Sequence, residues 1–396
     1  IFLIGVIGFT VASGLASLAW SGDMLVTTRV VQGAFAGIMV PQVLSSVQVM
    51  FAPEERGPIF GVVGALSAIG AIAGLLLGGW LVTADVLGTG WRSIFLINVP
   101  VGILLVAATV LFVPNSRSEH PVGLDLAGVA LGALAVFLVV FPLTDGRAAG
   151  WAWWIWMMLV AAPFAIGLFI RQQRRKLSAD GTALLPLPLF QNRGFSSGLL
   201  VQVVSSVGNG GYSLVLLFYM QAALGFTAFS AGLALLPIGI GSMIGTPVAM
   251  LLMKRLGKQA VLLGGALQAA AFGWVMMVIK SEGSDLSGWS LTPALTVAGI
   301  GMMVLIMPQT SIALDTVPTS EAGAASGTFT TFGQVGMVLG VALAGAVYFG
   351  EISDTSDAQA AVTAGLWVII AAYALAGIAA LTMPSVQIGS KEDGET

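Results

Sequence analysis

The sequence predicts an all-α membrane protein built from two related halves. Three observations support this prediction: a very apolar composition, a series of uncharged runs long enough to cross a bilayer, and a glycine pattern that occurs twice. Of the 396 residues, 57% are hydrophobic and 8% are charged, and the mean hydropathy is +0.98. Soluble proteins carry about 25% charged residues, so we expect this chain to lie in a lipid bilayer.

Twelve uncharged runs are long enough to cross about 30 Å of hydrocarbon as a helix. They cover residues 1–20, 30–50, 59–84, 93–114, 126–143, 148–170, 196–223, 229–253, 259–279, 291–314, 324–349 and 360–383. The many glycines within them allow neighbouring helices to approach closely. Each run is therefore predicted to be one transmembrane helix.

The repeated glycine pattern relates the two halves. Gly57, Gly61, Gly70, Gly74 and Gly79 recur 266 residues later as Gly323, Gly327, Gly336, Gly340 and Gly345. Pro41-Gln42 likewise recurs as Pro308-Gln309 at an offset of 267. A membrane chain with two related halves is typical of a secondary transporter, which binds its substrate between the halves near the bilayer midplane.

The position of the repeat predicts the domain organisation. In the second half the repeat occupies the fourth and fifth of six spans, whereas in the first half it occupies the second and third of the visible spans. If the two halves are built alike, two further spans are expected before Ile1. The full protein is expected to have fourteen spans, of which twelve are visible. The predicted parts are spans 3 to 6 of the first half (1–114), a two-helix linker (115–170), a basic cytoplasmic connector (171–195), the second half (196–383) and a tail (384–396).

The distribution of positive charge predicts the orientation. Eleven Lys and Arg residues fall at one set of span ends and three at the other. Positively charged loops stay on the cytoplasmic side, so the C-terminal tail is expected to be cytoplasmic. The formal net charge of −3 gives no reason to expect a nucleic-acid partner, and the absence of cysteine excludes disulfides and thiolate metal sites.

Arg29, directly before the run 30–50 and about six residues past Asp23, is the one charge predicted to lie inside an apolar span instead of at its end. A charge at this depth costs a few kcal/mol and normally faces the protein interior or a wet cavity. Arg29 is therefore a candidate coupling charge, together with Gln32 on the same helix. The alternative is that its side chain reaches the outer headgroups. Its counterpart in the second half falls near Thr296.

Small residues follow Arg29 and accumulate on one side of the next span. Helix packing and a smooth surface on which helix groups slide are both open interpretations of these glycines. The candidate packing and sliding positions are Gly33, Gly37, Gly70, Gly74, Gly78, Gly79, Gly336 and Gly340.

Six motifs carry a resemblance to a known family. They are Arg29-Val-Val-Gln32-Gly33, Gly70-Ala-Ile-Ala-Gly74-Leu-Leu-Leu-Gly78-Gly79, Trp91-Arg92-Ser-Ile-Phe95-Leu-Ile97-Asn98-Val-Pro100, Phe218-Tyr219-Met-Gln221, Ala231-Gly232-Leu-Ala-Leu-Leu-Pro237 and Lys254-Arg255-Leu256-Gly257-Lys258. The first resembles the fourth-span motif of the major facilitator superfamily, and the second resembles the fifth-span signature of its drug exporters, with Leu75 in place of a proline. The third resembles the opening of span six in the fourteen-span drug:proton antiporter branch. The fourth and fifth are similar to the second-half pattern of that branch. The sixth resembles a degenerate copy of the superfamily's loop between spans two and three.

The resemblance implies a multidrug efflux antiporter of the plasma membrane that exports hydrophobic or cationic small molecules, such as antibiotics, in exchange for protons. It also implies a proton-carrying carboxylate in the first span, which is one of the two spans expected before Ile1. Asp315 is the nearest visible candidate, and its alternative role is to end its helix at the cytoplasmic surface. A monomer with no cofactor and no metal is expected.

Polar groups within the apolar runs are the candidates for the substrate cavity, since a few polar groups on an apolar wall suit an amphipathic ligand. Hydrogen bonding between helices is the alternative role for each of them. The set comprises Gln42, Asn98, Gln202, Asn209, Tyr212, Tyr219, Gln221, Gln309 and Gln334.

Catalysis is disfavoured. Gly194-Phe-Ser196-Ser-Gly198 fits the pattern of a hydrolase nucleophile, but it leads into a membrane helix instead of following a strand. The only histidine, His120, lies in a charged loop, and no ATP-binding loop is present. A carrier of the same fold that imports or facilitates another solute or a lipid is the alternative function, since fold alone does not decide it.

Overall fold

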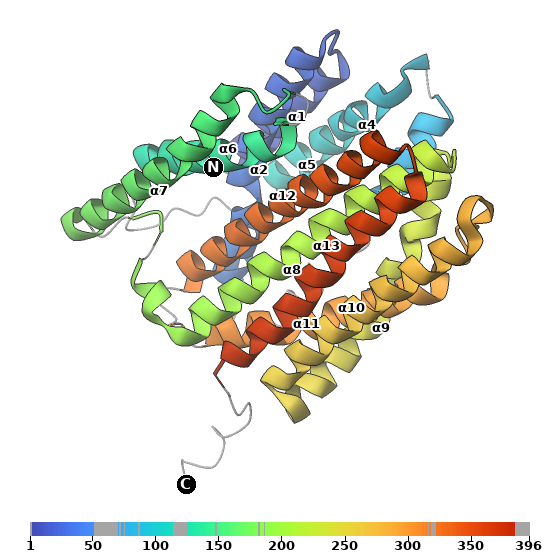
Figure 1. The fold of residues 1–396 in the computed structure, drawn as a ribbon. Helices are drawn as coiled ribbons and strands as arrows, with labels where there is room; N and C mark the ends of the chain where they lie inside the picture. Colours follow the sequence, from blue (N-terminus) through green and yellow to red (C-terminus); the bar gives the residue numbers. More distant parts are fainter. Residues whose placement is uncertain are drawn as a thin grey trace. The chain divides into compact units, whose positions relative to one another are not determined.

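The computed structural model describes residues 2–50, 70, 73–74, 76–85, 88–113, 125–146, 149–180, 183–185, 187–315, 317 and 322–384, and all regular structure within these ranges is helical. The long helices are α1 (Phe2–Ser17), α2 (Gly22–Met50), α5 (Asn98–Phe112), α6 (Leu126–Asp145), α7 (Trp153–Asp180), α8 (Arg193–Phe218), α9 (Ala228–Leu256), α10 (Lys258–Glu282), α11 (Thr292–Asp315), α12 (Ala322–Thr355) and α13 (Ala358–Ala379) (Figure 1). Shorter elements are η2 (Gly90–Arg92), α4 (Ser93–Leu96), η3 (Leu187–Gln191), the π-helical turn η4 (Tyr219–Ala223), η5 (Gly283–Asp285) and η7 (Ala380–Thr382).

Nine stretches of the described residues are helical, long and apolar enough to cross a membrane. They correspond to the predicted spans from 93–114 onward. The predicted span 1–20 is the shorter apolar helix α1, 30–50 lies within α2, and most of 59–84 lies outside the described residues. The prediction of an all-α membrane fold is confirmed.

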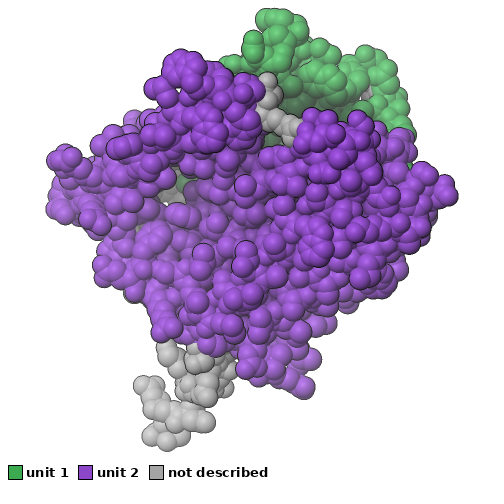
Figure 2. Space-filling view, in the orientation of Figure 1, with its two compact units in different colours: residues 1–121, 226–233 green, residues 122–225, 234–396 purple. Residues whose placement is uncertain are grey.

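Two compact units divide the chain (Figure 2). Unit 1 comprises residues Ile1–Pro121 and Phe226–Leu233, and unit 2 comprises Val122–Gly225 and Ala234–Thr396.

In unit 1, α1 lies against α2, α4 and α5. Ser13 donates a hydrogen bond to the carbonyl oxygen of Phe95 over 3.1 Å, and Arg92 donates one to that of Ala19 over 2.7 Å. These polar contacts join α1 and the residues after it to a segment 73 to 82 residues further along the chain.

In unit 2, α8 lies against α11, α12 and α13, and α10 lies against α11 and α13. Figure 1 shows α12, α8 and α13 side by side. Glycines, which have no side chain, allow this close approach. A Cβ built at Gly336 would lie 2.5 Å from the carbonyl oxygen of Val203, and one at Gly340 would lie 2.8 Å from Val207 Cα. The second copy of the glycine pattern thus lies against the backbone of α8.

The α6–α7 hairpin belongs to unit 2, and α6 lies against α12. Helix α7 continues to Asp180, so residues 171–180, predicted as part of the connector, are helical. Asp125 caps α6 by accepting a hydrogen bond from the Gly128 N–H over 2.9 Å. Gln172 and Gln173 of α7 donate to the same carboxylate over 2.8 and 2.7 Å. One buried carboxylate therefore joins the first turn of α6 to α7.

We expect Asp125→Ala to lower the free energy of unfolding by about 1–2 kcal/mol, because α6 loses its N-cap and the two glutamines of α7 lose their hydrogen-bond acceptor. Burial raises the pKa of Asp125, but hydrogen bonds from Gly128, Gln173 and Gln172 and the charge of Lys176 outweigh it, and the net pKa is lowered. A carboxylate with a lowered pKa stabilises the fold above its unfolded-state pKa of about 4 and loses this effect as the pH falls through its folded pKa.

Thermal unfolding of the purified protein checks this expectation. The difference in Tm between wild type and Asp125→Ala should be largest at neutral pH and shrink on acidification. Asp145→Ala, which removes an exposed carboxylate at the other end of α6, is the matched control. Equal Tm values for wild type and Asp125→Ala at neutral pH would contradict the claim that Asp125 stabilises the α6–α7 hairpin.

Candidate functional site: a polar cavity in the second half

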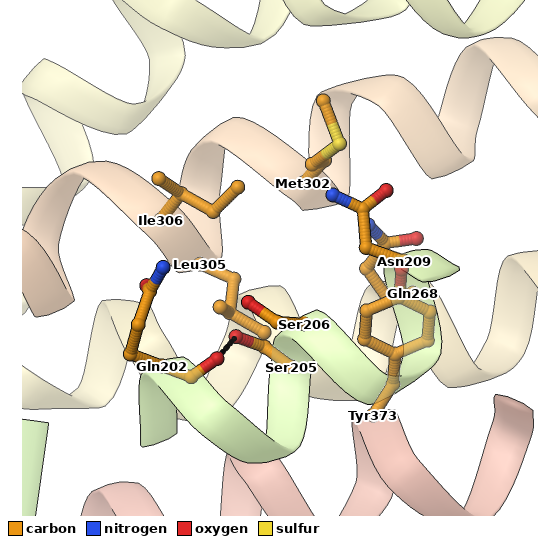
Figure 3. A pocket seen from close by; sticks show the side chains of 9 residues that line it. All are labelled: Gln202, Ser205, Ser206, Asn209, Gln268, Met302, Leu305, Ile306 and Tyr373. Atoms are coloured by element: carbon orange, nitrogen blue, oxygen red, sulfur yellow. Dashed lines mark hydrogen bonds between the residues drawn. The ribbon is translucent and has the colours of Figure 1, made fainter. Parts of the chain in front are cut away.

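A small cavity with a volume of about 60 Å³ lies inside unit 2. Four helices supply its walls: α8, α10, α11 and α13. Its lining residues, drawn in Figure 3, are Gln202, Ser205, Ser206, Asn209, Gln268, Met302, Leu305, Ile306 and Tyr373.

Helix geometry explains how one helix supplies four polar groups. Residues three or four apart share a face of a helix, and Gln202, Ser205, Ser206 and Asn209 follow that spacing on α8. Helix α11 contributes the apolar wall through Met302, Leu305 and Ile306.

The buried base of the cavity carries polar atoms that have no protein partner among the described residues. The atoms are Gln268 Oε1 and the Tyr373 hydroxyl, and the two side chains are 1% and 2% exposed. Leaving a buried polar atom unpaired costs about 1–3 kcal/mol. Figure 3 shows Asn209, Gln268 and the hydroxyl end of Tyr373 gathered at one end of the cavity. A site that maintains such groups is suited to a ligand that hydrogen-bonds to them.

Aromatic packing holds the Tyr373 ring in place. It stacks on Phe272 with an interplanar angle of 5° and 5.6 Å between ring centroids, and Tyr212 lies 5.3 Å from the same Phe272 ring. A Cβ at Gly208 would come within 2.7 Å of Tyr373 Cε2 and Cζ, so this glycine makes room for the ring.

A glutamine pair joins α8 and α11 beside the cavity. Gln309 Nε2 donates a hydrogen bond to Gln202 Oε1, and Oε1 of the fully buried Gln309 has no protein partner among the described residues. Of the predicted cavity residues, Gln202 and Asn209 line the cavity, Gln309 is bonded to Gln202 beside it, and Tyr212 packs on Phe272 behind Tyr373.

Three other predicted cavity residues lie elsewhere in unit 2. Tyr219 is buried in η4, seventeen residues beyond Gln202, which is about 25 Å along a helix. Gln221 is half-buried in the same turn, and Gln334 is exposed on α12. The structure does not bring these three to the cavity.

The predicted coupling residues of unit 1 contact each other. The Arg29 guanidinium lies 4.3 Å from the centroid of the Phe95 ring, and Nη1 donates to Gln32 Oε1 over 2.9 Å. Gln32 is 3% exposed, whereas Arg29 is exposed. The partners of this charge are therefore an aromatic face and an amide.

The other predicted residues of unit 1 have varied surroundings. Asn98 donates to Ser13 Oγ over 3.0 Å and so joins α5 to α1, and Gln42 is half-buried on α2. A Cβ at Gly79 would lie 2.7 Å from Phe229 Cα. Within unit 1, no described atom beyond the adjoining backbone lies within 4 Å of a Cβ built at the remaining predicted packing glycines, which are Gly33, Gly37, Gly70, Gly74 and Gly78.

Asp315 is the last residue of α11, where it is exposed and accepts a hydrogen bond from Ser311 over 3.0 Å. No group of three or more His, Cys, Asp and Glu residues in the described ranges could hold a metal ion.

The sequence prediction missed four polar lining residues: Ser205, Ser206, Gln268 and Tyr373. Gln268 and Tyr373 satisfy the criterion applied to the others, a polar side chain in the middle of an apolar run. That criterion could have found both, but it could not have placed them beside Asn209, because the sequence does not contain the register between helices.

A sequence model described as Major Facilitator Superfamily matches residues 1–341. The chain is 35% identical over 361 residues to the probable actinorhodin transporter of Streptomyces coelicolor, covering 90% of this chain and 62% of that protein. It is 30% identical to the tetracenomycin C resistance and export protein of Streptomyces glaucescens, covering 89% and 64%, and 30% identical to a puromycin resistance protein of Streptomyces alboniger, covering 92% and 72%. The chain therefore spans about three fifths of the length of the first two relatives.

Solved structures share the fold. A crystal structure of an auto-inhibited POT family peptide transporter has a TM-score of 0.61 and 18% identity, covering 97% of this chain and 83% of that one. A POT family transporter in complex with 5-aminolevulinic acid has a TM-score of 0.63 and 13% identity, covering 96% and 79%. At this identity the likeness concerns the fold alone.

Proposed function

Because the chain belongs to the major facilitator superfamily, we propose that it forms most of a secondary active transporter that exports hydrophobic or cationic small molecules in exchange for protons. The observation that carries this proposal is the cavity of uncharged polar groups within otherwise apolar helices. A few polar groups in an apolar wall bind amphipathic molecules and fix their orientation.

The names of the similar proteins support drug or antibiotic export. They refer to transport of actinorhodin, to resistance to and export of tetracenomycin C, and to resistance to puromycin. All three names concern transport of, or resistance to, a particular compound. We extend this class, and not a particular compound, to the present protein.

The mechanism that we propose is alternating access, in which the two halves rock about the substrate site. Arg29 is the coupling charge in this mechanism, and a carboxylate in the first span carries the proton. Glycine-rich surfaces of the fifth spans permit the motion. The protein would act as a monomer in the plasma membrane with its C-terminal tail in the cytoplasm.

Uptake by inverted membrane vesicles that contain the full-length protein tests this function. An imposed proton gradient should drive accumulation of a fluorescent lipophilic probe, and an uncoupler should abolish it. Vesicles with the same amount of folded protein but no gradient-dependent accumulation would contradict proton-driven export and favour a facilitator or another substrate class.

A further inference from the structure

The cavity in unit 2 is too small for a whole drug molecule. Its volume of about 60 Å³ is far below the roughly 300–1,000 Å³ of pockets that hold drug-sized ligands. It has room for one small functional group. Gln202, Ser206, Asn209, Met302 and Ile306 are only half-buried, whereas Gln268, Leu305 and Tyr373 are buried. The rest of a ligand would lie outside this recess.

No charged side chain belongs to the recess. Residues 194–253, 259–279, 286–314, 322–350 and 358–390 contain no Asp, Glu, His, Lys or Arg. These ranges include every residue that lines the cavity. A cation brought here would lose its hydration with no carboxylate to compensate, and burying an unpaired charge is far more costly than burying a hydrogen-bonded neutral group.

The aromatic ring at the base does not replace a counter-charge. A cation binds an aromatic residue over its face, but the Tyr373 ring is stacked on Phe272 and packs closely against Gly208. What Tyr373 presents to the cavity is its hydroxyl (Figure 3). Gln268 contributes Oε1, which accepts, and the amide of Asn209 can both donate and accept.

We propose that this recess is an anchor subsite for one uncharged hydroxyl or carbonyl group, and that the transported molecules are apolar, uncharged compounds bearing such a group instead of lipophilic cations. A hydroxyl donates to Gln268 Oε1 and accepts from Tyr373 or Asn209, and a carbonyl accepts from the last two. The ligand group thereby satisfies polar atoms that have no protein partner. The proposed substrate class rests on the proposed export function. Binding of a ligand at the recess does not depend on transport and can be measured separately.

A pair of uncharged three-ring probes tests the anchor directly. Anthrol carries a hydroxyl where methylanthracene, substituted at the same ring position, carries a methyl group. We expect the purified full-length protein to bind anthrol about tenfold more tightly, because the methyl analogue leaves the buried polar atoms unpaired. Equal affinities for the two probes would overturn the proposal.

Two variants assign the preference to the recess. Tyr373→Phe removes only the unpartnered hydroxyl and should keep the wild-type Tm, and Gln268→Leu removes the acceptor. Each should bring the affinities for the two probes to within about threefold of each other. Tyr348→Phe removes a tyrosine hydroxyl from a residue outside the recess, beside Phe349, and should leave the preference unchanged. A full preference in folded Tyr373→Phe would contradict the assignment, even where Gln268→Leu does not fold.

Transport separates this inference from the proposed function. In vesicles with a proton gradient, anthrol should be moved and tetraphenylphosphonium, a lipophilic cation, should not. Gradient-driven transport of the cation, with its binding weakened in Tyr373→Phe, would overturn the neutral substrate class while leaving export intact. The tenfold binding preference without transport of either probe would support the anchor and contradict the export function.

Discussion

Replacing Gly340 with Ala is expected to separate α12 from α8 and to destabilise the second half. A Cβ at this position would overlap the carbonyl group of Val207, and backbone atoms cannot move aside as a side chain can. Overpacking of this kind costs about 1–3 kcal/mol, and replacing glycine within a helix offsets only about 0.5–1 kcal/mol of it. Gly340→Leu should prevent the two helices from packing at all.

Gly345→Ala on the same helix is the matched control. The nearest atoms to a Cβ there are Leu214 Cδ1 and Cδ2 at 3.6 Å, which is ordinary contact. This variant should keep or slightly raise the Tm, whereas Gly340→Ala should lower both the Tm and the amount of folded protein. Equal behaviour of the two variants would show that close approach at Gly340 is not required.

The second large effect is expected from Arg29→Ala, which should reduce proton-driven transport to background while folded protein remains in the membrane. Arg29 directly precedes the predicted run 30–50, and in the described part of unit 1 its guanidinium lies over Phe95 and donates a hydrogen bond to Gln32. A positive charge with no ion-pair partner in the described part of the chain is available to pair with the carboxylate that carries the proton.

Arg29→Lys serves as the control for charge. Lysine keeps the positive charge but lacks the planar guanidinium that lies over Phe95, so its transport rate should fall between those of wild type and Arg29→Ala. Vesicle uptake, normalised to folded protein, provides the measurement. Undiminished transport in Arg29→Ala would remove this residue from the mechanism.

Much of the fold was predictable because apolar runs of sufficient length have few alternatives to a membrane helix. The run 126–143, for example, corresponds to α6 at Leu126–Asp145. The ends were less predictable. Helix α7 continues through the basic residues to Asp180, and α2 begins at Gly22 instead of residue 30. Charge marks where hydrocarbon ends, whereas the helix itself can continue into the hydrated interface.

The site was predictable only in part. Gln202 and Asn209 could be chosen because polar groups in apolar runs are rare, but Tyr219 and Gln221 satisfied the same criterion and lie far along the helix. The missed Tyr373 and Gln268 reach the cavity through the packing of α13 and α10 against neighbouring helices. Which polar groups converge depends on these interhelical contacts, and a local sequence pattern does not contain them.

The two glycine copies illustrate the same limit. Gly336 and Gly340 lie against α8 backbone, whereas for Gly70 and Gly74 no described atom of their own unit beyond the adjoining backbone lies within 4 Å of an added Cβ. Matching sequences therefore predict matching helices, but the contact of each glycine depends on its partner helix. A packing role for the first copy stays a prediction.

The most direct test of the account is whether substrate movement drives protons. The full-length protein would be reconstituted in liposomes with a trapped pH-sensitive dye, and an anthrol gradient would be imposed with no initial pH difference. Antiport predicts proton movement opposite to anthrol movement, which Arg29→Ala should abolish. An ionophore that clamps the internal pH should abolish the dye signal that reports it. Protein-dependent anthrol flux with no accompanying proton movement would contradict the central claim.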